Sequence, residues 1–362
     1  MKSSKILVTK SYLPSKKRYI QYVKRIFKSH SLTNFGENVI KLENELKKFL
    51  NIKNILLTAN GELALEVAMR LLKIKGEVIT TPFSFVATTN SILINGLIPK
   101  FVDIDDKTFN INTLNIEKGI NRNTELILPV HVFGNPCDVE DIENISNKYN
   151  LKVIYDAAHA FAVKYKNNSV LNFGDISILS FHATKIFHTI EGGALIINDE
   201  NLYEEAKELI NFGISNKGEI NSCGTNAKMN EFEAAMGLCI LNDIDKVISR
   251  KKEIFELYKY KLSDIVEFQI LRQDIKYNYS YCPILVKNEK ELLKLIEKLN
   301  QENIFPRRYF YPSLNTLKYL KNYEKMKISE DISSRILCLP TYVDLKEKDQ
   351  LKIIKIIKES LK

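Results

Sequence analysis

The chain has 362 residues, of which 45% are hydrophobic and 27% charged. These values are ordinary for a soluble globular protein of two or three domains, and they exclude disordered, collagen-like and coiled-coil compositions. The formal net charge of +9 suits nucleic acid, an acidic membrane surface or a polyanionic small molecule. The lysines are spread along amphipathic stretches, without a basic tail carrying interleaved aromatic residues, so we expect no nucleic-acid partner.

Cysteine usage and the N-terminal segment bear on the compartment. The five cysteines are odd in number, widely spaced and without a CxxC pair, which argues against a disulfide framework. The first residues contain no apolar core of the kind that a signal peptide has, and no apolar run reaches the roughly 18 residues of a membrane span. We therefore expect a cytoplasmic protein with no membrane partner.

From about residue 52 onward, short apolar runs alternate with amphipathic segments. The predicted strands and helices pair as 54–58 with 62–72, 77–81 with 86–95, and 126–130 with 139–149, and a strand at 151–155 follows. Further strands are predicted at 176–181 and 194–198, and further helices at 202–211 and 231–241. This alternation predicts a mostly parallel sheet covered by helices.

The pattern changes after about residue 246, where the chain becomes rich in lysine. Helices are predicted at 251–262, 289–300 and 346–361, with one strand at 281–286. These elements indicate a smaller α+β domain at the C-terminal end.

Asp156 stands at the end of an apolar strand, within Tyr155-Asp156-Ala157-Ala158-His159. Ligands of open α/β sheets bind beyond the carboxyl ends of the strands, so a carboxylate there is a candidate site residue. It could simply cap the next helix. Alternatively, it could be a buried partner for a cation, such as a protonated pyridine nitrogen in a cofactor.

Lys185 lies among apolar residues, between Phe181 and Phe187. A surface lysine is the plain interpretation in a chain this rich in lysine. However, burial lowers the pKa of a lysine and favours the neutral nucleophile that forms a Schiff base. The upstream Asp156 and the downstream Gly192-Gly193 pair, which permits close backbone approach, favour the functional interpretation.

A phosphate site is suggested where a strand runs through Asn60-Gly61 into a helix, because free amides at a helix start bind anions. Ser180 could add a hydroxyl to the same anion. Phe85 could stack on a planar ring or belong to the core. Four histidines fall between residues 131 and 188 without the spacing of a metal site, so we expect no metal.

Taken together, these residues resemble the DegT/DnrJ/EryC1/StrS sugar aminotransferases, and the resemblance covers nearly the whole chain. It is carried by an ordered series of motifs: SLTNFG at 31–36, the Asn60-Gly61 turn, FVDID at 101–105, PVHVFGNP at 129–136, the Asp156 and Lys185 motifs, NAKMNE at 226–231 and RILCLP at 335–340.

The resemblance implies an α/β protein with the aspartate-aminotransferase fold, fold type I of the enzymes that use pyridoxal 5'-phosphate (PLP). A large PLP-binding domain with a mainly parallel mixed sheet would span residues 31–245, and a small α+β domain would span 246–362. Residues 1–30 would pack with the small domain.

The resemblance also implies a role for each site residue. Lys185 would bond the cofactor, Asp156 would pair with its pyridine nitrogen, and His159 would lie near its ring hydroxyl. The remaining implied contacts are the ring stack of Phe85, the phosphate contacts of Ser180 and of the Gly61 and Glu62 backbone, and a phosphate contact made by Asn226 in the neighbouring subunit. The last contact implies a homodimer with shared sites. Glu62 departs from the family, which usually has Ser or Thr there.

The implied function is transfer of an amino group from L-glutamate to C4 of a dTDP-4-keto-6-deoxy sugar, for surface glycan biosynthesis. A C3 aminotransferase acting on a 3-keto sugar is the alternative within the family. Two alternatives to an aminotransferase stay open at this point: a non-catalytic regulator with the PLP fold, and a basic nucleic-acid binder. Lys185 argues against the dehydrating branch of the family, which has histidine at this position.

Overall fold

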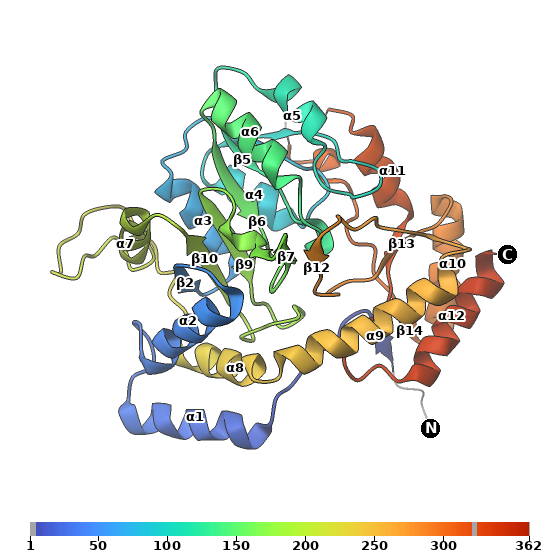
Figure 1. Cartoon of the computed structure of the whole chain (residues 1–362), viewed down its shortest axis with the longest axis horizontal. Coiled ribbons are helices and arrows are strands. Elements are labelled where there is room, and N and C mark those ends of the chain that lie inside the picture. The colour runs from blue at the N-terminus through green and yellow to red at the C-terminus, as the bar shows by residue number, and fades with distance from the viewer. Residues whose placement is uncertain (1–4, 321–323, 362) are drawn as a thin grey trace.

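The computed structural model describes residues 5–320 and 324–361 (Figure 1). Its main sheet has seven strands in the order β2-β10-β9-β6-β5-β3-β4. Strand β10 is antiparallel to β2 and β9, and the other neighbouring pairs are parallel. The strands are β2 (Ile55–Thr58), β3 (Glu77–Thr80), β4 (Ile98–Phe101), β5 (Thr124–Leu128), β6 (Lys152–Asp156), β9 (Ile176–Ser180) and β10 (Gly193–Ile197). The predicted α/β class with a mainly parallel mixed sheet is confirmed.

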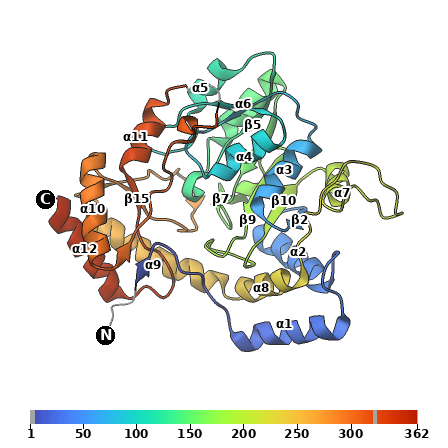
Figure 2. The ribbon, with the colours of Figure 1, turned by 180° about the vertical axis from the view of Figure 1, so that it is seen from behind.

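Both faces of this sheet are covered, because alternate residues of every strand except the edge strand β4 enter different apolar clusters. In β2, for example, Leu57 packs on one side and Leu56 on the other. Figures 1 and 2 show the two sides. One layer contains α2 (Glu37–Leu50), α5 (Thr113–Gly119), α6 (Val139–Tyr149) and α8 (Glu231–Leu241), and the other contains α3 (Gly61–Leu71), α4 (Val86–Ile94) and α7 (Glu200–Leu209).

Several helices begin at side-chain caps that the sequence supplies. The Asn60 side chain accepts a hydrogen bond from the Leu63 amide at the start of α3, and Asn230 forms a capping box with Glu233 at the start of α8. The helices predicted at 62–72, 139–149 and 231–241 are confirmed to within a residue. Helix α9 (Ile244–Leu262) begins earlier than the predicted residue 251, because Ile244 and Val247 extend its buried stripe.

The C-terminal part contains a three-stranded antiparallel sheet of β11 (Glu267–Phe268), β13 (Pro283–Leu285) and β15 (Ile336–Cys338). Helices α9, α10 (Glu289–Gln301) and α12 (Glu347–Leu361) pack with this sheet in one apolar cluster. Two short pairings add β12 (Ile275–Lys276) to β7 (Lys164–Tyr165), which also pairs with β8 (Asn168–Ser169). Helix α11 (Lys327–Arg335) precedes β15.

The N-terminal segment contacts both parts of the chain. Strand β1 (Ile6–Leu7) pairs with β14 (Ile304–Phe305) in the C-terminal part. Helix α1 (Lys16–Ser29) instead packs along α8, where the Tyr19 hydroxyl donates a hydrogen bond to the Phe232 carbonyl at 3.3 Å. Helix α9 crosses the expected boundary between residues 245 and 246, and the division at that point remains our proposal. Within the described residues, no helix combines the length and hydrophobicity that crossing a membrane requires.

Candidate active site

The carboxyl ends of β6 and β9 open into a cavity of about 590 Å³. The parallel strands bring Asp156 and Ser180 to the same edge of the sheet, and the start of α3 adds Gly61. The predicted site residues that line this cavity are Gly61, Glu62, Phe85, Asp156, His159, Ser180 and Lys185, and the C-terminal part adds Tyr281, Arg307, Tyr309 and Phe310.

An anion cradle lies where α3 begins beside β9. The Asn60 side chain caps the Leu63 amide at 2.8 Å, while the amides of Gly61 and Glu62 head the helix before its first internal hydrogen bond. A Cβ at Gly61 would lie 2.9 Å from Cβ of Ser180, and one at Gly193 would lie 2.6 Å from the Gly61 nitrogen. Glycine at both positions therefore keeps the Ser180 hydroxyl close to the helix start, as a bound phosphate requires.

Asp156 is a buried carboxylate held in place by two donors. Its Oδ2 accepts a hydrogen bond from the Thr88 hydroxyl at 2.8 Å, and its Oδ1 accepts one from the Ala158 amide at 3.1 Å. Burial raises the pKa of Asp156, and both hydrogen bonds oppose that shift. A carboxylate in this setting gains most from a cationic partner, such as a protonated pyridine nitrogen.

Lys185 lies in the loop between β9 and β10, where its amide donates to the His182 carbonyl at 2.8 Å. Burial lowers the pKa of the Lys185 amine to about 8, and the negative charge of Asp156 opposes the shift. The neutral, nucleophilic form of the amine is therefore far more populated near neutral pH than it is for an ordinary lysine.

His159 is positioned by aromatic neighbours and by one backbone group. Its Nδ1 accepts a hydrogen bond from the Phe133 amide at 3.2 Å, which leaves the hydrogen on Nε2. The rings of Phe133 and Phe310 stack with it at 6.1 and 5.6 Å between centroids. Burial lowers the pKa of His159 well below its usual range, so the ring is a neutral hydrogen-bond donor.

Phe85 and Asn226 occupy very different places. Phe85 lines the cavity with 58% of its surface exposed, which excludes the core interpretation and leaves its ring available for stacking. Asn226 is exposed in the segment between α7 and α8, where its Oδ1 accepts a hydrogen bond from Lys228 at 2.9 Å. It does not line the cavity of its own chain.

Several cavity residues were missed in the sequence. Thr88 and Ser84 stand in the same stretch as Phe85, and the Ser84 hydroxyl lies 2.7 Å from that of Thr88, which holds Asp156. The sequence signal that could have identified them was the presence of small hydroxyl residues beside Phe85, which was itself a predicted site residue. Tyr281 and Arg307 come from distant segments that show no local motif.

These groups fit pyridoxal phosphate. The cradle at Gly61 suits a phosphate, Asp156 suits a ring nitrogen, and the Lys185 amine suits an aldehyde carbon. The described residues contain no cluster of three or more His, Cys, Asp or Glu side chains that could hold a metal ion.

Glu62 gives a testable consequence, because it carries a negative charge next to the phosphate cradle. We expect Glu62→Ser to tighten PLP binding by up to roughly tenfold, since a like charge is removed. Absorbance titration of the cofactor-free chain with PLP measures the change. Glu66→Ser, on the same helix but outside the cavity lining, is the matched control, and unchanged affinity in Glu62→Ser would contradict the expectation.

Comparisons with known proteins find relatives over nearly the whole chain. The model of the DegT/DnrJ/EryC1/StrS aminotransferase family matches residues 14–358. The chain is 44% identical to a dTDP-4-amino-4,6-dideoxy-D-glucose transaminase of Shigella dysenteriae, covering 98% of each chain. It is 39% identical to a transaminase of the same name from Escherichia coli, covering 99% of each. The solved structure of DesI with its TDP-sugar product superposes with a TM-score of 0.94 at 27% identity, covering 99% of this chain and 93% of that one.

Proposed function

Because the chain belongs to the DegT/DnrJ/EryC1/StrS aminotransferase family, we propose that it transfers an amino group from L-glutamate to C4 of a dTDP-4-keto-6-deoxy sugar. The product is a 4-amino-4,6-dideoxy sugar nucleotide. The predicted family, enzyme class and PLP dependence are confirmed by the family match and the transaminase relatives. The observation that carries the proposal is that Lys185, Asp156 and the anion cradle meet in one cavity.

The cofactor, when bound, supplies an electron-withdrawing ring that acidifies the hydrogen on the amine-bearing carbon of the substrate. Lys185 is the lysine in the cavity lining, so its amine is the group that bonds the cofactor and later carries the proton. Its lowered pKa lets it accept that proton and then release it to the neighbouring carbon. Asp156 stabilises a positive charge on the ring nitrogen from its buried, doubly hydrogen-bonded position.

The 4-keto sugar is favoured over the 3-keto alternative by the two relatives, both of which are named as 4-amino-4,6-dideoxy-D-glucose transaminases. The net charge of +9 agrees with a diphosphate substrate. In the cavity lining, the guanidinium of Arg307 is held by the Tyr309 hydroxyl at 3.2 Å and is available to an anionic group. A nucleic-acid binder does not explain the cavity, and a non-catalytic regulator with the PLP fold is disfavoured by the two relatives, which are both named as transaminases.

The substrate proposal is tested by supplying 4-keto and 3-keto nucleotide sugars separately, each with L-glutamate. We expect turnover with the 4-keto isomer, and NMR of the product should place the new amine on C4. Turnover with the 3-keto isomer alone would overturn the C4 assignment and leave the aminotransferase activity in place.

We further propose that the protein is a cytoplasmic homodimer that shares its sites and serves surface glycan biosynthesis. Asn226 supports the shared site, because it lies exposed and away from the cavity of its own chain. In this arrangement its side chain reaches the cofactor phosphate in the other subunit.

Asn226→Ala is expected to weaken PLP affinity roughly 10- to 100-fold without dissociating the dimer, since one hydrogen bond to a charged group is lost. Equilibrium dialysis measures the affinity, and sedimentation measures the assembly. In heterodimers of Asn226→Ala with Lys185→Ala, the site that keeps Lys185 should bind PLP with wild-type affinity. Weakened binding at that site would show instead that Asn226 acts within its own chain.

A further inference from the structure

Tyr281 approaches Lys185 from the C-terminal part of the chain. The Lys185 Nζ donates a hydrogen bond to the Tyr281 hydroxyl at 3.4 Å and lies 6.0 Å from the centroid of its ring. The ring of Tyr281 packs against His159, with centroids 4.5 Å apart, and against Phe133 and Tyr309 at 5.4 and 5.9 Å. The hydroxyl is thereby held at the reacting amine by rings on several sides.

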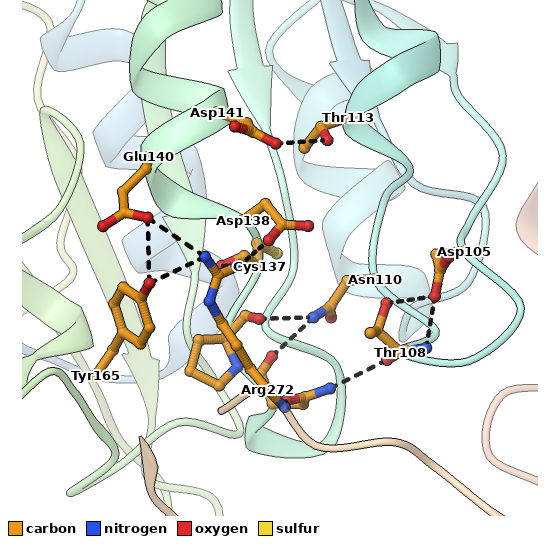
Figure 3. Close-up of polar contacts among 12 residues, drawn as sticks. Asp105, Thr108, Asn110, Thr113, Cys137, Asp138, Glu140, Asp141, Tyr165 and Arg272 are labelled. Atoms are coloured by element: carbon orange, nitrogen blue, oxygen red, sulfur yellow. Dashed lines mark hydrogen bonds and ion pairs between the residues drawn. The ribbon is translucent and has the colours of Figure 1, made fainter. Parts of the chain in front are cut away.

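Residues 269–281, here called the crossing segment, are fastened to the large sheet domain before they reach the cavity. Figure 3 shows Arg272 of this segment beside Cys137, Asp138, Glu140 and Tyr165. Its guanidinium donates to Asp138, to the Cys137 carbonyl at 3.3 Å and to the Tyr165 hydroxyl at 3.1 Å. Opposite charge and several hydrogen bonds therefore fix the start of the segment.

The end of the crossing segment is fixed from both sides. The Asn278 side chain donates to the His159 carbonyl at 2.8 Å and to the Phe161 carbonyl at 2.9 Å. On the other side, the buried Lys251 amine donates to the Thr341 carbonyl at 2.6 Å, and the Thr341 hydroxyl donates to the Ser280 carbonyl at 3.4 Å. The peptide that carries Tyr281 is thus tied to both parts of the chain.

We propose that Tyr281 is a catalytic residue whose hydroxyl oxygen accepts a hydrogen bond from the Lys185 amine and stabilises the charged form of that amine. When Lys185 takes the proton from the amine-bearing carbon of the substrate, the amine becomes an ammonium and donates to this oxygen. The phenol keeps its own proton throughout, because burial raises the pKa of Tyr281 well above its ordinary value.

Other groups also act on the Lys185 amine, and they stay the same when Tyr281 is replaced. Asp156 from β6 raises the pKa of the amine, and the neutral His159 neighbours it. The charged or titratable groups that line the same cavity are Glu62, His182, Glu191, Tyr309 and Arg307. Replacing Tyr281 by phenylalanine leaves all of them in place and keeps the packed ring.

The test uses the full chain freed of cofactor and measures the pH dependence of Lys185 carbamylation by cyanate, followed by peptide mass spectrometry. Only the neutral amine reacts, so the midpoint of the profile reports the pKa of Lys185. We expect Tyr281→Phe to lower this midpoint by about half a pH unit or more, because the charged amine loses an acceptor. Tyr279→Phe, on the same segment with its ring against Tyr277 and Phe255, is the matched control and should leave the midpoint unchanged.

An unchanged or raised midpoint in Tyr281→Phe, or an equal fall in Tyr279→Phe, would overturn the proposal. Thr341→Val, which removes the hydrogen bond to Ser280, should lower the midpoint less and provides the test if Tyr281→Phe does not fold. In the loaded enzyme, the half-reaction with α-deuterated glutamate should slow about tenfold in Tyr281→Phe, with a larger isotope effect and an unchanged KM. Because no sugar is used, failure here is distinct from failure of the substrate proposal.

Discussion

Lys185→Ala is expected to abolish turnover while leaving the fold intact. The substitution removes both the amine that bonds the cofactor and the group that carries the proton. Among the residues that the structure describes, Lys185 is the one lysine in the cavity lining, so none of the other described lysines is placed there to substitute for it. Steady-state turnover with glutamate measures the loss, and the absorbance band of the bound, lysine-linked cofactor should disappear.

Lys185→Arg is the matched variant, because arginine keeps a positive charge near Asp156 but stays protonated and is no nucleophile at neutral pH. It should be as inactive as Lys185→Ala while holding PLP more tightly. Circular dichroism and thermal unfolding of both variants report whether the fold is retained. Multiple turnovers at the wild-type rate by either variant would refute the assignment.

Asp156→Asn is expected to keep PLP bound and to lose several orders of magnitude in rate, roughly 10³-fold or more, since a neutral amide does not stabilise charge on the ring nitrogen. The fold should tolerate the change. The amide oxygen can accept from Ala158, and the amide nitrogen can donate to Thr88, whose hydroxyl can then donate to Ser84. Stopped-flow measurement of the glutamate half-reaction tests the loss.

Thr88→Val provides the graded control for Asp156, because it keeps the carboxylate and removes one of its hydrogen bonds. Loss of that bond raises the pKa of Asp156 further, and this should slow the half-reaction. Because the carboxylate itself remains, the slowing should be much smaller than in Asp156→Asn. Near-normal kinetics in Asp156→Asn would show that Asp156 is not needed to stabilise charge on the ring nitrogen.

Residues at strand ends could be predicted from the sequence because their signals are local. Asp156 and Ser180 follow apolar runs that fold as β6 and β9, and Asn60-Gly61 interrupts the step from β2 to α3. Chain order and the rule that strand ends carry the ligand site then bring them together. The same local reasoning located most helices of the large domain.

Other features depend on contacts between distant segments, which leave little trace in the sequence. Tyr281 stands beside Lys185 because the crossing segment is fastened at Arg272 and Asn278, and none of these residues has a motif around it. Helix α1 was not predicted, although Tyr19, Val23 and Ile26 recur at helical spacing and give this segment a clear amphipathic pattern. The antiparallel direction of β10 could not be predicted, because an apolar run predicts a buried strand without indicating which way that strand runs in the sheet.

The place of β10 in the sheet has a consequence for how the protein matures during synthesis. Gly193, its first residue, pairs with Thr58 on one side and with Ser180 on the other. Asn60, Asp156 and Lys185 all leave the ribosome before this strand. The anion cradle, however, is complete only when β10 inserts between its two neighbours. Such long-range pairing forms late in folding. A nascent chain ending before residue 193 should therefore bind no cofactor. PLP would then bind and stabilise the native state, and it would not serve as a template for folding of the incomplete chain.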